Sequence, residues 1–102
     1  MNKVQLIGYL GADPEIREYR GASFVKLRLA TQERQKNNAM TTTWHTVLFW
    51  GEEKARMIST QLIRGSHLLI EGSLDYKEYT NRNGETFLQT QINAFRFLNL
   101  DR

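Results

Sequence analysis

The sequence predicts an all-β fold, a small five-stranded Greek-key barrel with one helix. Polar and apolar residues alternate along most of the chain, which is the pattern of strands that bury one face. Helical spacing of apolar residues occurs in one segment, 52–64, and glycines inside strand runs supply the bends that a small barrel needs. A chain of 102 residues without cysteine is a single domain, residues 1–102, that buries roughly 65% of its unfolded surface without disulfides.

Three strands are predicted before the helix. The first covers 2–10 and has one clean apolar face, with Gly8 at a bend. A short extended return over 15–19 leads into the second strand, 21–31, which carries its positive charges outward. The third covers 43–51, where β-branched and aromatic residues are concentrated and glycine closes the run.

Between the second and third strands, 32–42 is polar and lacks an apolar period, so we expect a loop of about a dozen residues, a length that is usually functional or mobile. The helix over 52–64 has Glu52 and Glu53 at its positive N-terminal end. Gly65 is the expected C′ residue that terminates it.

A long hairpin follows the helix. Alternation predicts strands over 67–79 and 85–98, and Asn-Arg-Asn-Gly at 81–84 is a tight-turn signal. Three strands, one helix and a two-strand hairpin close best as the OB-fold, with the helix between strands 3 and 4. The outer face and two of the loops of such barrels bind oligonucleotides or oligosaccharides.

The third strand is the most informative for function. Trp44 and Trp50 share one parity, so both indoles leave the same face of the sheet, whereas His45, Val47 and Phe49 share the other. Two such indoles are either core aromatics or a stacking platform. Because the other parity fills the core by itself and the flanking loops are basic, the sequence favours a platform.

The net charge is +3, and the cations lie on turns or on polar parities of strands. Single-stranded nucleic acid offers bases that stack on aromatic rings and phosphates that attract cations. The predicted stacking residues are Trp44, Trp50 and Tyr79. The predicted phosphate-contacting residues are Lys3, Lys26, Arg28, Arg34, Lys36, Lys77 and Arg82. The competing interpretation is a solvated basic surface without a partner.

Other classes of function have little support. His45 and His67 lack metal-ligand spacing, and no cofactor is expected. Asp13 and Glu15 flank a proline turn without a pocket signal, and no nucleophile–base pair or phosphate loop is present, so we expect no enzyme. Without a signal peptide or an apolar run of about 18 residues, the expected location is the cytoplasm.

Several short motifs occur in the order and spacing of bacterial single-stranded DNA-binding proteins. They are Asn2-Lys3-Val4, Ile7-Gly8, Leu10-Gly11, Asp13-Pro14-Glu15, Leu29-Ala30-Thr31, Trp44-His45, Gly65-Ser66 and Ile70-Glu71-Gly72. On these residues the chain resembles that family over its whole length. The resemblance implies an OB-fold homotetramer, with a dimer as the alternative, that wraps single-stranded DNA in replication, recombination or repair and is associated with the bacterial nucleoid.

The resemblance also implies roles for individual residues. Trp44 matches a stacking tryptophan of the family, Trp50 stands where the family has phenylalanine, and Tyr79 stands where it has tryptophan. Gln35 replaces a tryptophan that is common in the family's long loop. His45 matches a position at the subunit contact. The predicted oligomer interface consists of Asn2, Val4, Leu6 and His45.

Family members usually continue into a flexible linker and an acidic tip that recruits replication and repair proteins, whereas this sequence stops at Arg102. Two explanations remain open: a naturally short form carried by a plasmid or transposon, and a polypeptide that has been cut. The alternative function is a primosome-type OB-fold accessory factor that contacts replication proteins and binds DNA or RNA weakly. Tyr9, Tyr19 and Tyr76 are expected to be ordinary barrel or interface aromatics, and some of Phe87, Phe95 and Phe97 are expected to pack.

Overall fold

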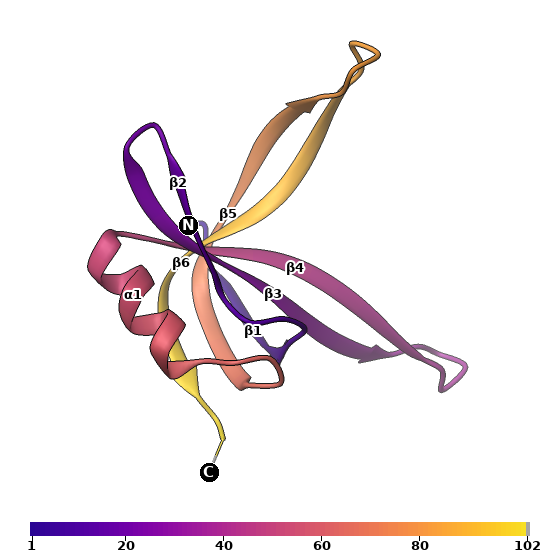
Figure 1. Cartoon of the computed structure of the whole chain (residues 1–102). Helices are drawn as coiled ribbons and strands as arrows, with labels where there is room; N and C mark the ends of the chain where they lie inside the picture. Colours follow the sequence, from indigo (N-terminus) through magenta and orange to yellow (C-terminus); the bar gives the residue numbers. More distant parts are fainter. Residues whose placement is uncertain (102) are drawn as a thin grey trace.

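The computed structural model describes residues 1–101 and contains, over that range, six strands and one helix. Figure 1 shows their arrangement. The elements are β1 (Val4–Leu10), β2 (Glu15–Tyr19), β3 (Ala22–Arg34), β4 (Met40–Trp50), α1 (Glu52–Gln61), β5 (His67–Thr80) and β6 (Thr86–Asn99). The predicted all-β fold with one helix after the tryptophan strand is confirmed.

Strand pairing follows the order β1-β5-β6-β4-β3-β2, and β1 also pairs with β3. Five strands therefore form a ring of pairings, in which the short parallel β4–β6 contact at Val47 and Leu48 joins the two halves. These are the five strands predicted for the barrel, and residues 1–101 contain a sixth strand that was not predicted. The return over Glu15–Tyr19 is a hydrogen-bonded strand, β2, paired along its length with β3, so the helix lies between the fourth and fifth strands. All five β2 residues are exposed, which explains why no alternation revealed it.

The core lies inside this ring and is closed by the helix. Its buried members are Leu10, Val25, Leu27, Leu29, Val47, Phe49, Ala55, Ile58, Leu62, Leu68, Ile70 and Ile92. The five strands of the ring contribute residues of one parity, as the pattern predicted, whereas β2 contributes none. Phe97 packs edge-on against Phe49, with ring centroids 5.8 Å apart, so one of the three C-terminal phenylalanines does pack, whereas Phe87 and Phe95 are exposed.

The loop predicted over 32–42 was wrong. Strands β3 and β4 stay paired out to Arg34↔Met40, and the turn contains only residues 35–39. This part of the hairpin extends beyond the barrel, with both of its faces in solvent. It therefore lacks the apolar period that identifies a strand, although backbone pairing and the β-branched Thr41–Thr43 favour one.

The helix ends at Gln61, three residues before the predicted end at Arg64, so Gly65 is not its C′ residue. The exit is held instead by side chains. Asp13 accepts a hydrogen bond from the Arg64 backbone N–H (2.8 Å), and the Ser66 hydroxyl accepts one from the Ile63 N–H (3.0 Å). The Asp-Pro turn and the Arg-Gly-Ser segment, far apart in sequence, thus form one structural unit.

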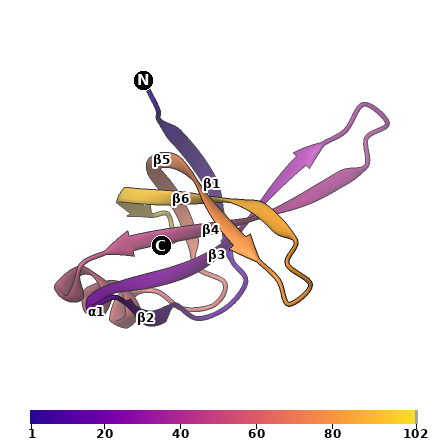
Figure 2. The ribbon, with the colours of Figure 1, turned by 90° about the horizontal axis from the view of Figure 1, so that it is seen from above.

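Three paired extensions leave the barrel in different directions (Figures 1 and 2). We name them the β2–β3 hairpin (residues 15–26), the β3–β4 arm (residues 30–44) and the β5–β6 arm (residues 74–92). Their roots meet around the outer face of β4. The candidate site lies on this outer face, between the roots of the extensions.

Candidate nucleic-acid interface

The outer face of β3 and β4 carries both tryptophans. Successive cross-strand pairs on this face are Phe24↔Trp50, Lys26↔Leu48, Arg28↔Thr46 and Ala30↔Trp44. Trp44 is 50% exposed and Trp50 is 41% exposed, while Val47 and Phe49 of the opposite parity are buried. The prediction that the two indoles leave the same outward face is confirmed, and cationic positions lie between them.

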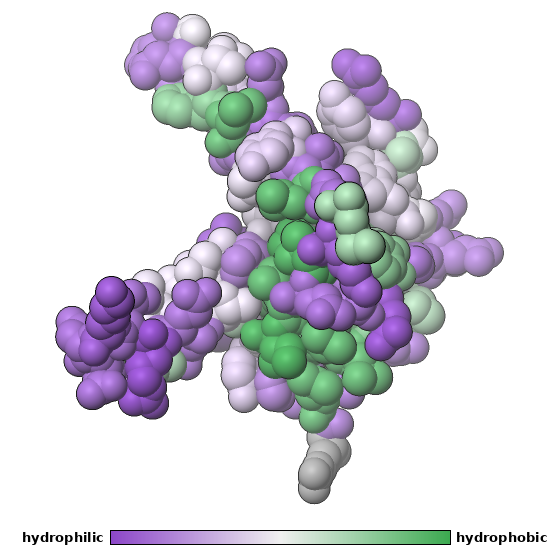
Figure 3. All heavy atoms as spheres, turned by 180° about the vertical axis from the view of Figure 1, so that it is seen from behind, coloured by the Kyte–Doolittle hydropathy of each residue, from purple (hydrophilic) through white to green (hydrophobic). Residues whose placement is uncertain are grey.

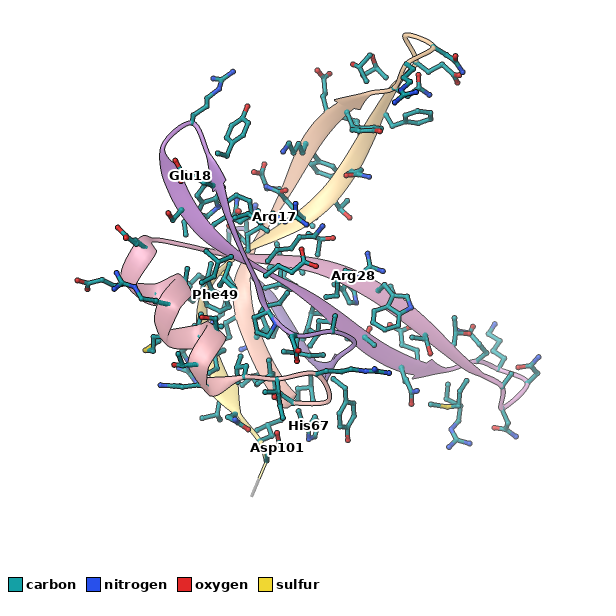
Figure 4. All side chains as sticks on the ribbon, in the orientation of Figure 1. Arg17, Glu18, Arg28, Phe49, His67 and Asp101 are labelled. Carbon is teal, nitrogen blue, oxygen red and sulfur yellow. The ribbon has the colours of Figure 1, made fainter. Side chains whose placement is uncertain are left out.

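Trp44 lies over the backbone of Gly11. A Cβ added to Gly11 would be 2.5 Å from the indole Cη2, so glycine leaves room for the six-membered ring of the indole beside the loop after β1. The Arg28 guanidinium lies 5.3 Å from the centre of the indole, within the range of a cation–π contact. Figure 4 labels Arg28 on the β3–β4 side of the molecule. Trp44 therefore offers a supported and partly exposed ring with a cation beside it.

Trp50 is fixed in orientation by two contacts. Its ring centroid is 4.7 Å from that of Phe24, and its Nε1 donates a hydrogen bond to the Asn93 side-chain oxygen at 3.2 Å. The Asn93 amide in turn donates to Asp75 at 3.1 Å. An indole held by a hydrogen-bonded relay from β6 and β5 is preorganised for a planar ligand.

A cavity of about 220 Å³ opens between the β2–β3 hairpin and the root of the β5–β6 arm. Leu48 lies at its floor and is 5% exposed although it belongs to the outward parity, because the two extensions rise on either side of it. Lys77 from β5 reaches across to β2, with its ammonium 5.1 Å from the Tyr19 ring centroid. A second cavity of similar size continues past Lys26 and Thr46, so the two form one groove.

The β5–β6 arm presents another aromatic pair. Tyr79 and Phe87 are directly opposite each other in the ladder and are both about half exposed, on the face that also carries Lys77 and Gln89. Arg82 is exposed in the turn of this arm. Tyr79, Lys77 and Arg82 thus lie along one arm.

The remaining predicted cations are divided among three regions. Lys26 lines the groove, and Arg34 and Lys36 are exposed at the far end of the β3–β4 arm. Lys3 forms an ion pair with Glu71 (3.2 Å) on the outer side of β1 and β5. Arg17, which was not among the predicted site residues, lies between the β2–β3 hairpin and the β5–β6 arm and lines both cavities (Figure 4).

Comparison with known proteins agrees with this geometry. Residues 1–100 match the model of the Single-strand binding protein family. The chain belongs to this family. It is 37% identical over 100 residues to "Single-stranded DNA-binding protein 1" of Xylella fastidiosa, and 36% identical over 98 residues to the "Single-stranded DNA-binding protein" of Rhizobium meliloti.

These alignments cover 92% and 90% of this chain, and 73% and 56% of the respective relatives. A Rickettsia felis protein, "Single-stranded DNA-binding protein", is 35% identical over 98 residues, which are 90% of this chain and 64% of the relative. Among solved structures, "Plasmodium falciparum SSB complex with ssDNA" superposes with a TM-score of 0.84 at 27% identity, covering 99% of this chain and 96% of that one. The likeness extends over the whole described fold.

The residues predicted for the subunit interface in this family member have defined places within one chain. Asn2 forms paired hydrogen bonds with the backbone of Leu74 (2.8 and 2.9 Å), which extends the β1–β5 ladder by a side chain. Val4 and Leu6 are half-buried against the core. His45 is half-buried and its Nε2 lies 2.8 Å from the Thr31 hydroxyl. Burial lowers the pKa of His45, and the nearby Glu33 charge opposes that shift.

Glu71 is the centre of a charged cluster on the back of the molecule. It is buried (6% exposed) and accepts a hydrogen bond from Gln5 at 2.8 Å, together with ion pairs from Lys3 and Arg96 at 3.2 and 3.0 Å. Hydrogen bonds from Gln5 and Lys3, followed by the charges of Arg96 and Lys3, lower the pKa of Glu71 against the opposing effect of burial. This carboxylate is ionised at neutral pH and stabilises the β1–β5–β6 sheet.

Sequence reasoning missed two aromatics of the site. Phe24 shares the outward parity of Lys26 and Arg28, so the alternation that identified the cations contained the signal for it. Tyr19 lies on a strand without an apolar face, and only the structure places it beside Lys77. Within residues 1–101 there is no cluster of three or more metal-ligating side chains, and no helix long and apolar enough to cross a membrane.

Proposed function

We propose that this chain binds single-stranded DNA without sequence preference, by stacking bases on Trp44, Trp50 and Tyr79 and by neutralising phosphates with the lysines and arginines between them. The observation that carries the proposal is the outer face of β4, where two half-exposed indoles flank a groove bordered by cations. Every base has a π-face, so stacking of this kind tolerates any sequence.

A single strand fits this surface better than a duplex does. The aromatic rings lie on a curved face and on a projecting arm, and they require unstacked bases, which a duplex does not offer. The structural neighbour whose title names a complex with single-stranded DNA shares this fold at 27% identity. In the cell, such binding serves to protect exposed strands in the bacterial cytoplasm during replication, recombination or repair, and it requires no catalysis or cofactor.

Titration with oligo-dT, oligo-U and duplex DNA of equal length tests the proposal. We expect tight, salt-dependent binding to oligo-dT and markedly weaker binding to the duplex. Equal affinity for the duplex would contradict it. Preference for oligo-U would indicate an RNA-binding OB-domain, and weak binding to all three would support an accessory factor that acts through protein contacts.

We also propose that the chain forms a homotetramer, with a dimer as the alternative. Within residues 1–101, β1 pairs with β3 only at Tyr9 and Leu10, so most of that edge has no strand beside it. The outer face of β1, β5 and β6 presents the aligned row Ile7–Leu69–Leu98, of which Ile7 is 58% exposed. Figure 3 shows hydrophobic side chains gathered on this back side of the barrel. An open strand edge beside an apolar face is suited to self-association.

Sedimentation at micromolar concentration tests this assembly. We expect a multiple of the 12.0 kDa chain for the unmodified protein and a smaller species for Ile7→Glu. Ile63→Glu is the matched control, because Ile63 is similarly exposed but follows the helix. A monomeric unmodified protein would end this proposal, as would equal effects of the two substitutions.

A further inference from the structure

The cavity between the β2–β3 hairpin and the β5–β6 arm has a composition that distinguishes it from an ordinary surface hollow. Its apolar walls come from Tyr19, Phe24 and Trp50, with Leu48 at the floor. At about 220 Å³ it lies below the roughly 300–1,000 Å³ of pockets for drug-sized ligands. It is therefore suited to one small planar group.

Polar groups are placed at the edge of the same cavity. The half-buried Gln91 from β6 offers an amide that both donates and accepts hydrogen bonds. Arg17 and Lys77 supply positive charge from the two sides. Arg17 donates from Nε to Glu15 at 3.1 Å, and this hydrogen bond, followed by the Arg17 charge, lowers the pKa of Glu15. The guanidinium is thereby oriented along β2.

Aromatic walls, an amide at the edge and cations at the mouth together match the chemistry of a nucleotide. We propose that this cavity is an additional subsite that receives one base of the bound DNA strand, with Tyr19 and Phe24 as stacking residues beyond the predicted set. The subsite depends on the proposed function, since its occupant is a base of the same strand that lies on Trp50. Continuity of the two cavities along Lys26 and Lys77 gives the backbone a path into it.

Lys77 has a particular role in this subsite. Its ammonium faces the Tyr19 ring at 5.1 Å and so connects the β5–β6 arm with the β2–β3 hairpin. A cation–π contact uses the ring face and leaves ammonium hydrogens available to a phosphate. A base that stacks on Tyr19 displaces this ammonium from the ring face, and Lys77 then holds the phosphate of the same nucleotide.

Tyr19→Ala tests the subsite, with Tyr19→Phe and Tyr76→Ala as matched controls. Tyr19 is 49% exposed on a projecting hairpin, so its removal should leave the fold intact, which thermal unfolding would verify. Tyr76 is 59% exposed on the opposite parity of β5 from Lys77, away from the cavity. Affinity is measured for oligo-dT and for a base-free deoxyribose-phosphate oligomer of the same length.

We expect Tyr19→Ala to weaken oligo-dT binding about 5- to 140-fold, which corresponds to the loss of one stacked base at about 1–3 kcal/mol. Its affinity for the base-free oligomer should not change, and both controls should bind oligo-dT like the unmodified protein. Unchanged oligo-dT affinity, or an equal loss on the base-free oligomer, would overturn the subsite alone. Failure of the unmodified protein to bind oligo-dT would overturn the proposed function with it.

Discussion

Gly11→Ala is a sensitive probe of where the Trp44 indole lies. The added Cβ would be 2.5 Å from the indole Cη2, whereas ordinary contacts of a Cβ are 3.4–4 Å, so the ring must move outward by about 1 Å. Forcing a side chain off its preferred rotamer costs about 0.5–1.5 kcal/mol. Gly11 does not have a positive φ, so alanine can adopt its backbone conformation. Apart from the collision with the indole, Gly11→Ala should therefore stabilise the fold by about 0.4–1 kcal/mol, because alanine lowers the conformational entropy of the unfolded chain.

These two effects can be separated by a double-mutant cycle with Trp44→Ala. In the unmodified background the opposing effects leave a net change in the free energy of unfolding of less than about 1 kcal/mol. In the Trp44→Ala background the collision is gone, so Gly11→Ala should stabilise the fold by about 0.4–1 kcal/mol. The difference, a coupling energy of about 0.5–1.5 kcal/mol, is measurable by urea unfolding at one fixed protein concentration.

The same cycle has a binding readout. An indole displaced by about 1 Å still presents a face, so Gly11→Ala should weaken oligo-dT binding less than Trp44→Ala, which removes about 1–3 kcal/mol. If Gly11→Ala shifts stability equally in both backgrounds, the indole does not lie over Gly11, and the placement of the platform would have to be revised.

Three further predictions concern charge. Lys77→Ala should flatten the slope of log K against log[salt] for oligo-dT by roughly 0.7, whereas Tyr79→Phe keeps both slope and affinity; an unchanged slope for Lys77→Ala would place the strand elsewhere. Because the folded pKa of Glu71 is lowered, its stabilisation is complete above the ordinary value of 4.5 and is lost as pH falls through the folded value. The free energy of unfolding of Glu71→Gln should therefore fall less steeply with decreasing pH than that of the unmodified protein. Identical pH profiles would show that the Glu71 cluster does not contribute to stability in acid. Because burial lowers the folded pKa of His45, stability should decline as pH falls below 6.5 and level off below the folded value. His45→Gln should remove that decline in pH-dependent unfolding, and its persistence would assign the titration to another group.

The sequence predicted the fold wherever a strand has one buried and one exposed face. The alternation of Val25, Leu27 and Leu29, and of Val47 and Phe49, identified the barrel core and placed both tryptophans outside it. It failed where both faces of a strand are in solvent. The β2 strand and the outer part of the β3–β4 arm have no apolar period, and only hydrogen bonding to a neighbour makes them strands.

The residues of the candidate site also fall into those that the sequence could predict and those that it could not. Residues whose parity was readable, such as Trp50 and Lys26, were predicted correctly to face outward. The cavity could not be predicted, because its walls come from β2, β3, β4, β5 and β6, and its formation depends on how the extensions diverge. Leu48 illustrates the difference: its parity is outward, yet it is buried because two extensions cover it.

The most direct test of the stacking platform is the intrinsic fluorescence of two single-tryptophan proteins, Trp44→Phe and Trp50→Phe, titrated with oligo-dT. Each protein retains one indole, and DNA binding is followed in parallel by anisotropy of a labelled oligonucleotide. We predict that the emission of both proteins is quenched to saturation at the same DNA concentration at which anisotropy saturates, because each remaining indole stacks on a base. Saturated binding with unchanged emission from both proteins would contradict the stacking platform.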